Sequence, residues 1–439
     1  MKFLIALAAT ASVLLPSVQA AKEVFAHVIV GNVRELNAAD WEDNVKLAQE
    51  AKIDGFVLNI AAQDESNTAS LDLIFAAAEK ANFKAFFSFD YAAQGAWPKD
   101  KVVETIAKYG VSPAYFKHDG DKLFVSTFEG PANAADWTDI KTTTNSFFVP
   151  DWSSVGAVEA AGLANSVADG LFSFDAWPTG NVNMTTEPDL AFQAALGDRA
   201  YMMPVSPWFY TNLPGFNKNW LWRGDELWDT RWAQVMEVNP DFVEILTWND
   251  YGESHYIGPV REKELGLFTS ANAPINYVKE ISHDGWRKFL GFYIEQYKTG
   301  VVPTEFEEKA AAYYRTAPAL ACGNGGTSGN NADFGETEVP PEQLMEDAIF
   351  FAALLKSDEG VTVSVKVGEE EKPASFNVFP AAGKGTPGVY RGSVPMGSAT
   401  GEVVVTVTRG GQAVASAEGG KPISATCENN VQNWNAVAV

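Results

Sequence analysis

Carboxylate side chains recur in this sequence directly after short apolar runs, and tryptophan and tyrosine residues are interleaved with them. The acids are Asp64, Asp90, Glu129, Asp151, Asp175, Asp250 and Glu253. Cleavage of a glycosidic bond needs one carboxylic acid to protonate the leaving oxygen and one carboxylate to drive water or attack the sugar. Flat aromatic rings suit the C–H faces of sugars. The combination therefore predicts a site that cleaves carbohydrate.

A structural role for these acids is the main alternative. Asp or Glu at the end of a strand often caps the next helix, and Asp250 and Glu253 have the spacing of a capping box. Gly252 and Pro259 would make a poor helix there, so we interpret this segment as a functional loop. For each of the other acids, a capping role and a chemical role both remain open.

Metal, cofactor and acyl-transfer chemistry find little support. The four histidines, His27, His118, His255 and His283, lack the paired spacing of zinc sites, and we expect neither a metal nor a cofactor. There is no Gly-x-Ser-x-Gly elbow and no partnered cysteine. We interpret His27, at the end of an apolar run, and His255, beside Glu253, as hydrogen-bond donors to sugar hydroxyls or to a catalytic acid.

Eight apolar runs, separated by amphipathic stretches, predict the elements that position these side chains. The runs span residues 24–30, 55–60, 84–89, 123–128, 146–149, 170–174, 200–205 and 242–247. Helix start signals lie between several of them, namely Asn37 or Asp40, Ser70, and Asp225. This alternation predicts an α/β fold, a (β/α)8 TIM barrel whose active site lies at the C-terminal ends of the strands. A doubly wound open sheet is the competing fold, but no glycine-rich phosphate loop follows the first run.

The pattern changes after about Ala319. Residues 322–331 are rich in glycine and asparagine and are interpreted as a linker or long loop. Antiparallel strands are predicted at residues 348–355, 361–367, 402–409 and 412–417, and they indicate a small C-terminal β-sandwich. The predicted organisation is a signal peptide over 1–20, a catalytic barrel over 21–318, and a linker with a β-sandwich over 319–439.

The first 20 residues have the layout of a secretory signal, with Lys2, a short apolar stretch and a small-residue end at Ala20. We therefore expect a secreted protein, extracellular or in a cell wall. Secretion would let Cys322 and Cys427 oxidise, and we expect them to pair, with two free cysteines as the alternative. Asn183 begins an Asn-Met-Thr sequon and is a candidate for glycosylation.

Composition limits the partners. The chain of 439 residues has 56 acidic and 32 basic residues, a formal net charge of −24, and no sustained Lys/Arg cluster. A nucleic acid or an anionic membrane surface is therefore not an expected partner. A hydrophobic fraction of 46% with 20% charged residues is far from the composition of disordered chains. We expect a monomer that folds around a sizeable core.

Several motifs resemble those of fungal glycoside hydrolase family 71, the α-1,3-glucanases or mutanases. They are Phe25-Ala26-His27-Val28-Ile29-Val30-Gly31-Asn32, Asp40-Trp41-Glu42-Asp43, Gly55-Phe56-Val57-Leu58-Asn59-Ile60, Ser88-Phe89-Asp90 and the long run from Thr247 to Pro259, TWNDYGESHYIGP. The resemblance covers nearly all of the chain after the signal. It implies a catalytic barrel followed by a β-sandwich and hydrolysis of α-1,3-glucan, from fungal wall or bacterial mutan, with inversion at the anomeric carbon.

The resemblance also implies site residues. Asp250 and Glu253 correspond to the catalytic pair and Asp64 to a third essential acid. With inversion, the two carboxylates would lie roughly 6.5–9.5 Å apart with a water between base and sugar. We expect Glu253 to be the acid and Asp250 the base. The expected substrate-binding residues are His27, Asn59, Asp90, Asp151, Asp175, Trp177, Trp208, Trp248, Asn249, His255 and Tyr256, with the tryptophans and Tyr256 as stacking platforms.

Two other functions remain open at this stage. The first is a barrel hydrolase for another linkage, such as an α-1,4- or β-1,3-glucan. The second, from a different class, is a non-catalytic protein that binds cell-wall glucan on the same barrel. The intact pair Asp250 and Glu253 counts against the second function.

Overall fold

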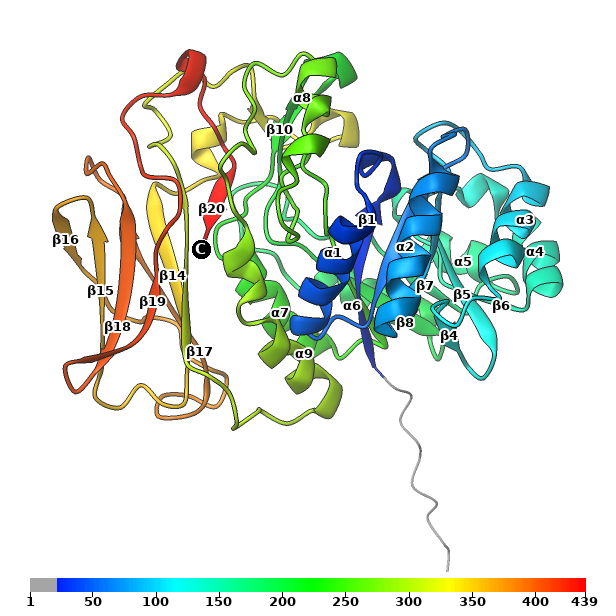
Figure 1. Ribbon diagram of the computed structural model, residues 1–439, viewed down its shortest axis with the longest axis horizontal. Coiled ribbons are helices and arrows are strands. Elements are labelled where there is room, and N and C mark those ends of the chain that lie inside the picture. Colours follow the sequence, from blue (N-terminus) through cyan, green and yellow to red (C-terminus); the bar gives the residue numbers. More distant parts are fainter. Residues whose placement is uncertain (1–21) are drawn as a thin grey trace, which may run out of the picture.

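The computed structural model describes residues 22–439, so the predicted signal peptide lies outside the described part. A region of parallel strands and helices and a region of antiparallel strands lie next to one another (Figure 1). Both regions are built around buried apolar side chains.

The parallel sheet confirms all eight predicted strand positions. Its strands are β1 (Glu23–Ile29), β2 (Gly55–Ala61), β3 (Lys84–Asp90), β5 (Lys122–Phe128), β6 (Ser146–Phe148), β7 (Gly170–Phe172), β8 (Ala200–Val205) and β11 (Phe242–Ile245). The order β5-β3-β2-β1-β11-β8-β7 is continuous, with β6 paired to β5. A short strand, β4 (Lys117–His118), is antiparallel to β5. Strands covered on both faces are buried along their length, which explains their unbroken apolar character.

Strands β6 and β7 meet through a few backbone contacts. Asp151 forms bridges with both Phe128 and Phe172. The amide of Phe172 donates to the carbonyl of Pro150 at 2.8 Å. The sheet therefore curls until its two ends approach one another around Asp151.

Helices follow the strands. They are α1 (Ala38–Glu50), α2 (Asn67–Ala81), α3 (Lys99–Tyr109), α4 (Asp136–Thr144), α5 (Ala157–Ala164), α6 (Glu187–Leu196), α7 (Leu227–Val238), α8 (Gly266–Ser270) and α9 (Leu290–Thr299). Asn37 caps α1 in a capping box with Asp40, as its sequence predicts. Helix α2 begins three residues before the expected start signal Ser70, which is buried inside the helix.

Two antiparallel sheets form the C-terminal region. The first has the order β17 (Gly388–Pro395), β14 (Ala348–Leu355), β12 (Lys309–Arg315), β20 (Ala436–Ala438). The second has the order β16 (Glu370–Pro373), β15 (Val361–Val367), β18 (Val403–Arg409), β19 (Gln412–Ala417). Their inward side chains share one apolar cluster. Strand β12 precedes the domain border expected at residue 318. It nevertheless pairs along its length with β14 and so belongs to the first antiparallel sheet.

The segment interpreted as a linker is packed against the parallel region. Between β8 and α7, strands β9 (Tyr210–Leu213) and β10 (Lys218–Leu221) form a hairpin, and β13 (Ser328–Gly329) pairs in parallel with β10. Thr327 and Asn330 are buried. The glycine-rich stretch, interpreted from its sequence as a linker or a long loop, is thus a long loop that braces the hairpin. Cys322 and Cys427 form the expected disulfide, with a Cα–Cα distance of 6.2 Å.

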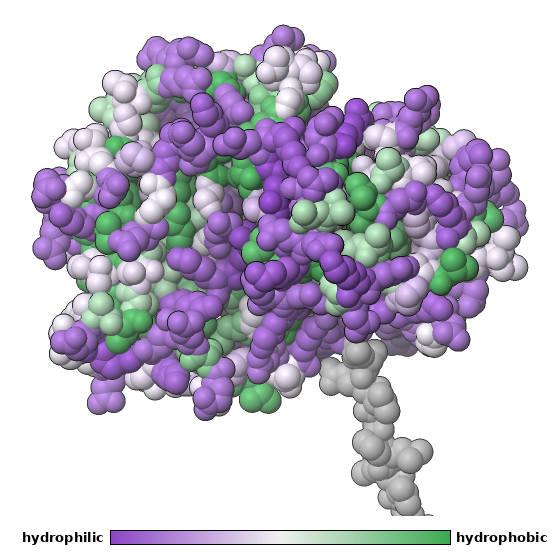
Figure 2. All heavy atoms as spheres, in the orientation of Figure 1, coloured by the Kyte–Doolittle hydropathy of each residue, from purple (hydrophilic) through white to green (hydrophobic). Residues whose placement is uncertain are grey.

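No helix within residues 22–439 has the length and apolar character needed to cross a bilayer. On the face shown in Figure 2, hydrophilic residues dominate and apolar residues form separate patches.

Candidate active site

The loop after β11 carries the Asp250 and Glu253 pair, and neighbouring strands hold it from several sides. The Asn249 side chain accepts from the amide of Ile29 at 2.8 Å and donates to its carbonyl at 3.0 Å. The amide of Trp248 donates to the carbonyl of His27 at 2.7 Å. The loop is therefore fixed to the C-terminal end of β1, where a parallel α/β sheet presents its functional groups.

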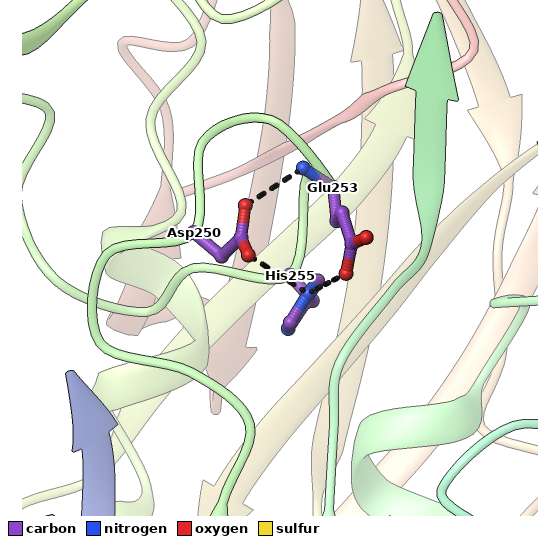
Figure 3. A group of neighbouring side chains, drawn as sticks. All are labelled: Asp250, Glu253 and His255. Carbon is purple, nitrogen blue, oxygen red and sulfur yellow. Dashed lines mark hydrogen bonds and ion pairs between the residues drawn. The ribbon is translucent and has the colours of Figure 1, made fainter. Parts of the chain in front are cut away.

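Within this loop the two acids and His255 converge (Figure 3). The amide of Glu253 donates to Asp250 Oδ1 at 3.0 Å, and no helix follows, so the capping-box spacing here serves a turn. His255 Nε2 lies 3.0 Å from Glu253 Oε2 and 3.8 Å from Asp250 Oδ2. His255 is almost fully buried, which matches its expected contact with a catalytic acid.

Lys218 is a site residue that sequence reasoning missed. Its Nζ lies 2.5 Å from Glu253 Oε1, and it reaches the site from the β9–β10 hairpin. The only available signal was the length of the connection between the run ending at 205 and the helix predicted from 226, which is long enough to hold a hairpin.

The pKa values of the two acids are shifted in opposite directions. Burial raises the pKa of Asp250, and the neighbouring charge of Glu253 raises it further. Burial alone would also raise the pKa of Glu253, but Lys218 and His255 together lower it well below its usual range. Glu253 in turn raises the pKa of Lys218, so the ammonium stays charged. The proton is therefore favoured on Asp250, opposite to the acid and base roles expected from the sequence.

The two carboxylates of the pair approach one another around His255. One oxygen of each carboxylate and a nitrogen of His255 all lie within 4.8 Å of one another. This limit joins the nearest ligand atoms, whereas the roughly 6.5–9.5 Å of an inverting pair and the roughly 5–5.5 Å of a retaining pair are separations of the carboxyl groups. The separation is short because both carboxylates turn toward the same imidazole.

Three converging ligand atoms raise the question of a metal. Lys218 already places a positive charge beside Glu253, and a divalent cation would have to displace or repel it. The donor set Asp250, Glu253 and His255 thus fits an acid–base pair better than a metal centre.

A second group of acids lies buried inside the curled sheet. Asp151 Oδ1 accepts from the amide of Ser153 at 3.0 Å, while its Oδ2 has no hydrogen-bond partner among the described residues. Burial raises the pKa of Asp151, and the charge of Glu129 raises it further. His27 Nδ1 lies 2.6 Å from Glu244 Oε1. Glu244 was missed because it is a single acid inside the apolar run of β11.

The remaining predicted polar residues have local partners. Asp64 accepts from Arg34 at 2.8 Å and from the Ser66 hydroxyl at 2.6 Å, and within residues 22–439 no hydrogen bond or ion pair joins it to Asp250 or Glu253. Burial alone would raise its pKa, but Ser66 and Arg34 lower it. Asp90 accepts from the amides of residues 92 and 93.

Three other predicted positions differ in exposure. Asn59 is buried on β2 in register with Ile29 of β1. Asp175 and Asn183 are exposed in the loop after β7. Asn183 Oδ1 accepts from Arg223 at 3.3 Å.

Only one of the four expected stacking rings has an exposed face. Trp177 is partly exposed, lies edge-on to His255 at 5.3 Å and stacks on Trp222 at 5.5 Å. Trp208, Trp248 and Tyr256 are buried. Trp208 donates to the carbonyl of residue 434 at 3.0 Å, and Tyr256 stacks on His283 at 3.7 Å. The structure therefore assigns these three rings to packing, and their expected role as sugar platforms is not supported.

A carboxylate pair with opposite proton preference at the C-terminal end of a curled parallel sheet is the arrangement used by acid–base hydrolases of the glycosidase type. The sequence model described as Glycosyl hydrolase family 71 matches residues 20–439. The chain belongs to this family.

Relatives at the sequence level cover most of the chain. A mutanase of Penicillium rubens is 35% identical, over 92% of this chain and 86% of its own length. The glucan endo-1,3-alpha-glucosidase agn1 of Schizosaccharomyces pombe is 33% identical, over 99% of this chain and 98% of its own length. Among solved structures, a GH99 endo-alpha-mannosidase of Bacteroides thetaiotaomicron has a TM-score of 0.49 at 14% identity, covering 63% of this chain and 97% of its own.

Proposed function

We propose that this protein hydrolyses α-1,3-glucosidic bonds within α-1,3-glucan. The single observation that carries the chemistry is the pair Asp250 and Glu253, in which burial and the charge of Glu253 raise the pKa of Asp250 while Lys218 and His255 lower the pKa of Glu253. The substrate is supported by the names of the two relatives, a mutanase and a glucan endo-1,3-alpha-glucosidase. Their identity extends over nearly the full chain, and the second name supports cleavage inside the polymer.

The proposed roles follow the charges. Asp250, protonated by its buried surroundings, donates its proton to the leaving glycosidic oxygen. Glu253, held ionised by Lys218 and His255, acts on the anomeric side. Trp177 stands next to His255 with part of its ring accessible and serves as a stacking surface for one glucose unit.

The same proposal includes the buried acids and Asp64. Asp151 has an oxygen without a hydrogen-bond partner among the described residues, and it contacts a sugar hydroxyl. The charge of Asp90 raises the pKa of Lys218, and Asp90 also contacts sugar hydroxyls. Asp64 contributes through Arg34, whose guanidinium it orients.

Inversion at the anomeric carbon is a separate part of the proposal. Its support is the resemblance to inverting α-1,3-glucanases. NMR of the product anomer during the first minutes of hydrolysis decides the question, because an inverting enzyme releases a β-anomer from an α-linked glucan.

The architecture proposed for this function is a (β/α)8 barrel followed by a β-sandwich. The bridges of Asp151 to both neighbouring strands support closure of the eight parallel strands. The shared apolar cluster of the two antiparallel sheets supports a sandwich, and the pairing of β12 supports a border before residue 309. Secretion is supported by the disulfide and by the predicted signal over 1–20.

The test is release of reducing sugar from insoluble α-1,3-glucan at acidic pH, beside starch and a β-1,3-glucan. Hydrolysis confined to the α-1,3 polymer is expected. Hydrolysis of another polymer instead would replace the substrate, and binding without release from all three would favour a wall-binding protein.

A further inference from the structure

The ammonium of Lys218 has one acidic partner in the structure. Among residues 22–439, Glu253 is the only acid within ion-pairing distance of it, at 2.5 Å. The side chain is about 41% exposed, so water could solvate the ammonium if the hairpin allowed it to turn away. The contacts that hold the β9–β10 hairpin therefore decide whether Lys218 stays on Glu253.

Strands β9 and β10 are tied to the catalytic loop itself. The amide of Tyr210 donates to the carbonyl of Glu253 at 3.0 Å, so the hairpin and the acid share a backbone contact. The hydroxyl of Tyr277 donates to the carbonyl of Gly252 at 2.6 Å and accepts from the amide of Asn212 at 3.3 Å. One tyrosine thus joins the hairpin and the turn between the two carboxylates.

The other edge of the hairpin rests on the segment that follows Cys322. Trp220 pairs with Ser328, and the amide of Asn330 donates to the carbonyl of Leu221 at 2.9 Å. Trp222 Nε1 donates to Glu336 at 2.8 Å. These contacts with the segment after Cys322 therefore fix the position of β10, from which Lys218 reaches Glu253.

We propose that Lys218 is a positioning residue that keeps Glu253 ionised and so leaves the proton of the pair on Asp250, with residues 322–344 bracing it in place. This inference rests on the proposed function, since it explains how the two acids acquire different roles. Lys218 touches Glu253 and acts through it.

The groups that face Glu253 come from two elements. Asp250 and His255 belong to its own loop, and Lys218 comes from β10, while Asp90 of β3 adds its charge to the field around Lys218. With Lys218 removed, His255 alone would balance two carboxylates whose oxygens lie within 4.8 Å. Close carboxylates raise one another's pKa, so Glu253 would take up a proton at a higher pH than in the native site.

The experiment is the pH profile of kcat/KM on soluble α-1,3-glucan oligosaccharides for the full chain and three variants. In Lys218→Met, we expect the acidic limb to move to higher pH by about 1 to 3 pH units, with activity on that limb falling about tenfold for each unit. Lys218→Arg keeps the cation and should restore the limb. Lys141→Met is the matched control, because it removes a half-buried ion pair with Asp169, 2.7 Å long, beside the other end of the sheet.

A uniform loss of activity in Lys218→Met with an unmoved limb would overturn the inference, because damage to the hairpin alone predicts that result. Thermal unfolding is followed for each variant, and Lys218→Gln gives a second neutral side chain should the methionine destabilise the hairpin. Asp250→Asn distinguishes a failure of the role proposed for Lys218 from a failure of the proposed catalytic pair. If it is inactive while Lys218→Met has a native profile, only the role of Lys218 fails; if it is fully active, the proposed pair itself fails.

Discussion

The parallel-sheet region and the antiparallel region differ in what they bury. Inside the parallel region, His27 and Glu244 form a buried contact and Asp189 pairs with Arg231, whose side chain is fully buried. In the two antiparallel sheets the buried cations, Arg315 and Lys372, pair with acids that are themselves about half exposed. Burying a charge costs stability unless the charge is paired. The region that buries both members of its charge pairs is also the region that carries the proposed catalytic pair.

The comparison shows which residues serve stability and which serve the site. In β15 and β18, inward valines alternate with half-exposed or exposed residues, so each sheet has one apolar face. In β1, β3 and β11, polar groups interrupt otherwise apolar strands close to the catalytic loop. In this chain, a polar residue inside an otherwise apolar strand therefore indicates the site better than the alternation of apolar and exposed residues does.

The largest expected effect is on catalysis. Asp250→Asn and Glu253→Gln should each lower kcat on α-1,3-glucan by about 10²–10⁴-fold, because each removes a proton donor or acceptor from the reaction. Reducing-sugar release gives the rate, and circular dichroism should show unchanged folding. Asp139→Asn, at an exposed acid of α4, is the control with native activity. Near-native turnover in either variant of the pair would remove the distinction between the two regions.

The next effect concerns a buried charge without a catalytic role. Arg231 makes two bonds to Asp189, of 2.9 and 3.0 Å, and neither side chain is exposed. Arg231→Met leaves the carboxylate unpaired and should lower the free energy of unfolding by about 3–5 kcal/mol. Denaturant unfolding measures it. Combining this change with Asp189→Leu should lose less than the single variant; an equal or larger loss would mean that packing, and not the orphaned charge, causes the effect.

The smallest effect tests the apolar core of the antiparallel sheets. Val405 is fully buried on β18, whereas its neighbour Val404 faces the partly exposed side. Val405→Thr places a hydroxyl in that core and should cost about 1–3 kcal/mol of unfolding free energy. Val404→Thr should change it by less than about 0.5 kcal/mol. Both should retain native kcat, and equal costs at the two positions would contradict the alternation.

Much of the fold was predictable because it depends on local pattern. Strands buried on both faces appear as continuous apolar runs, and half-buried strands as alternation, so the eight parallel strands and β14, β15, β18 and β19 were found near their true positions. Strand β12 was not predicted because its small residues Ala310–Ala312 carry no clear strand signal.

The site was predictable only where its residues share one segment. Asp250, Glu253 and His255 lie within six residues, and their contacts are largely local. Lys218 and Glu244 reach their partners through the tertiary fold, and a single lysine in a polar turn or a single glutamate in an apolar run gives no signal by itself. Burial of Trp208 and Tyr256 depends on residues 434 and 283, which no pattern around them reveals.

The pairing of β10 with β13 has a consequence for how the enzyme is made. Trp220 can pair with Ser328 only after the ribosome has added about a hundred more residues. At ordinary rates of synthesis this takes roughly 5 to 20 s. The parallel strands and the loop with Asp250 and Glu253 are all complete before that brace emerges. We therefore expect a nascent chain that ends before residue 322 to contain both catalytic acids without the support that holds Lys218 on Glu253. Competence for catalysis would then arrive late in translation, well after the catalytic residues themselves.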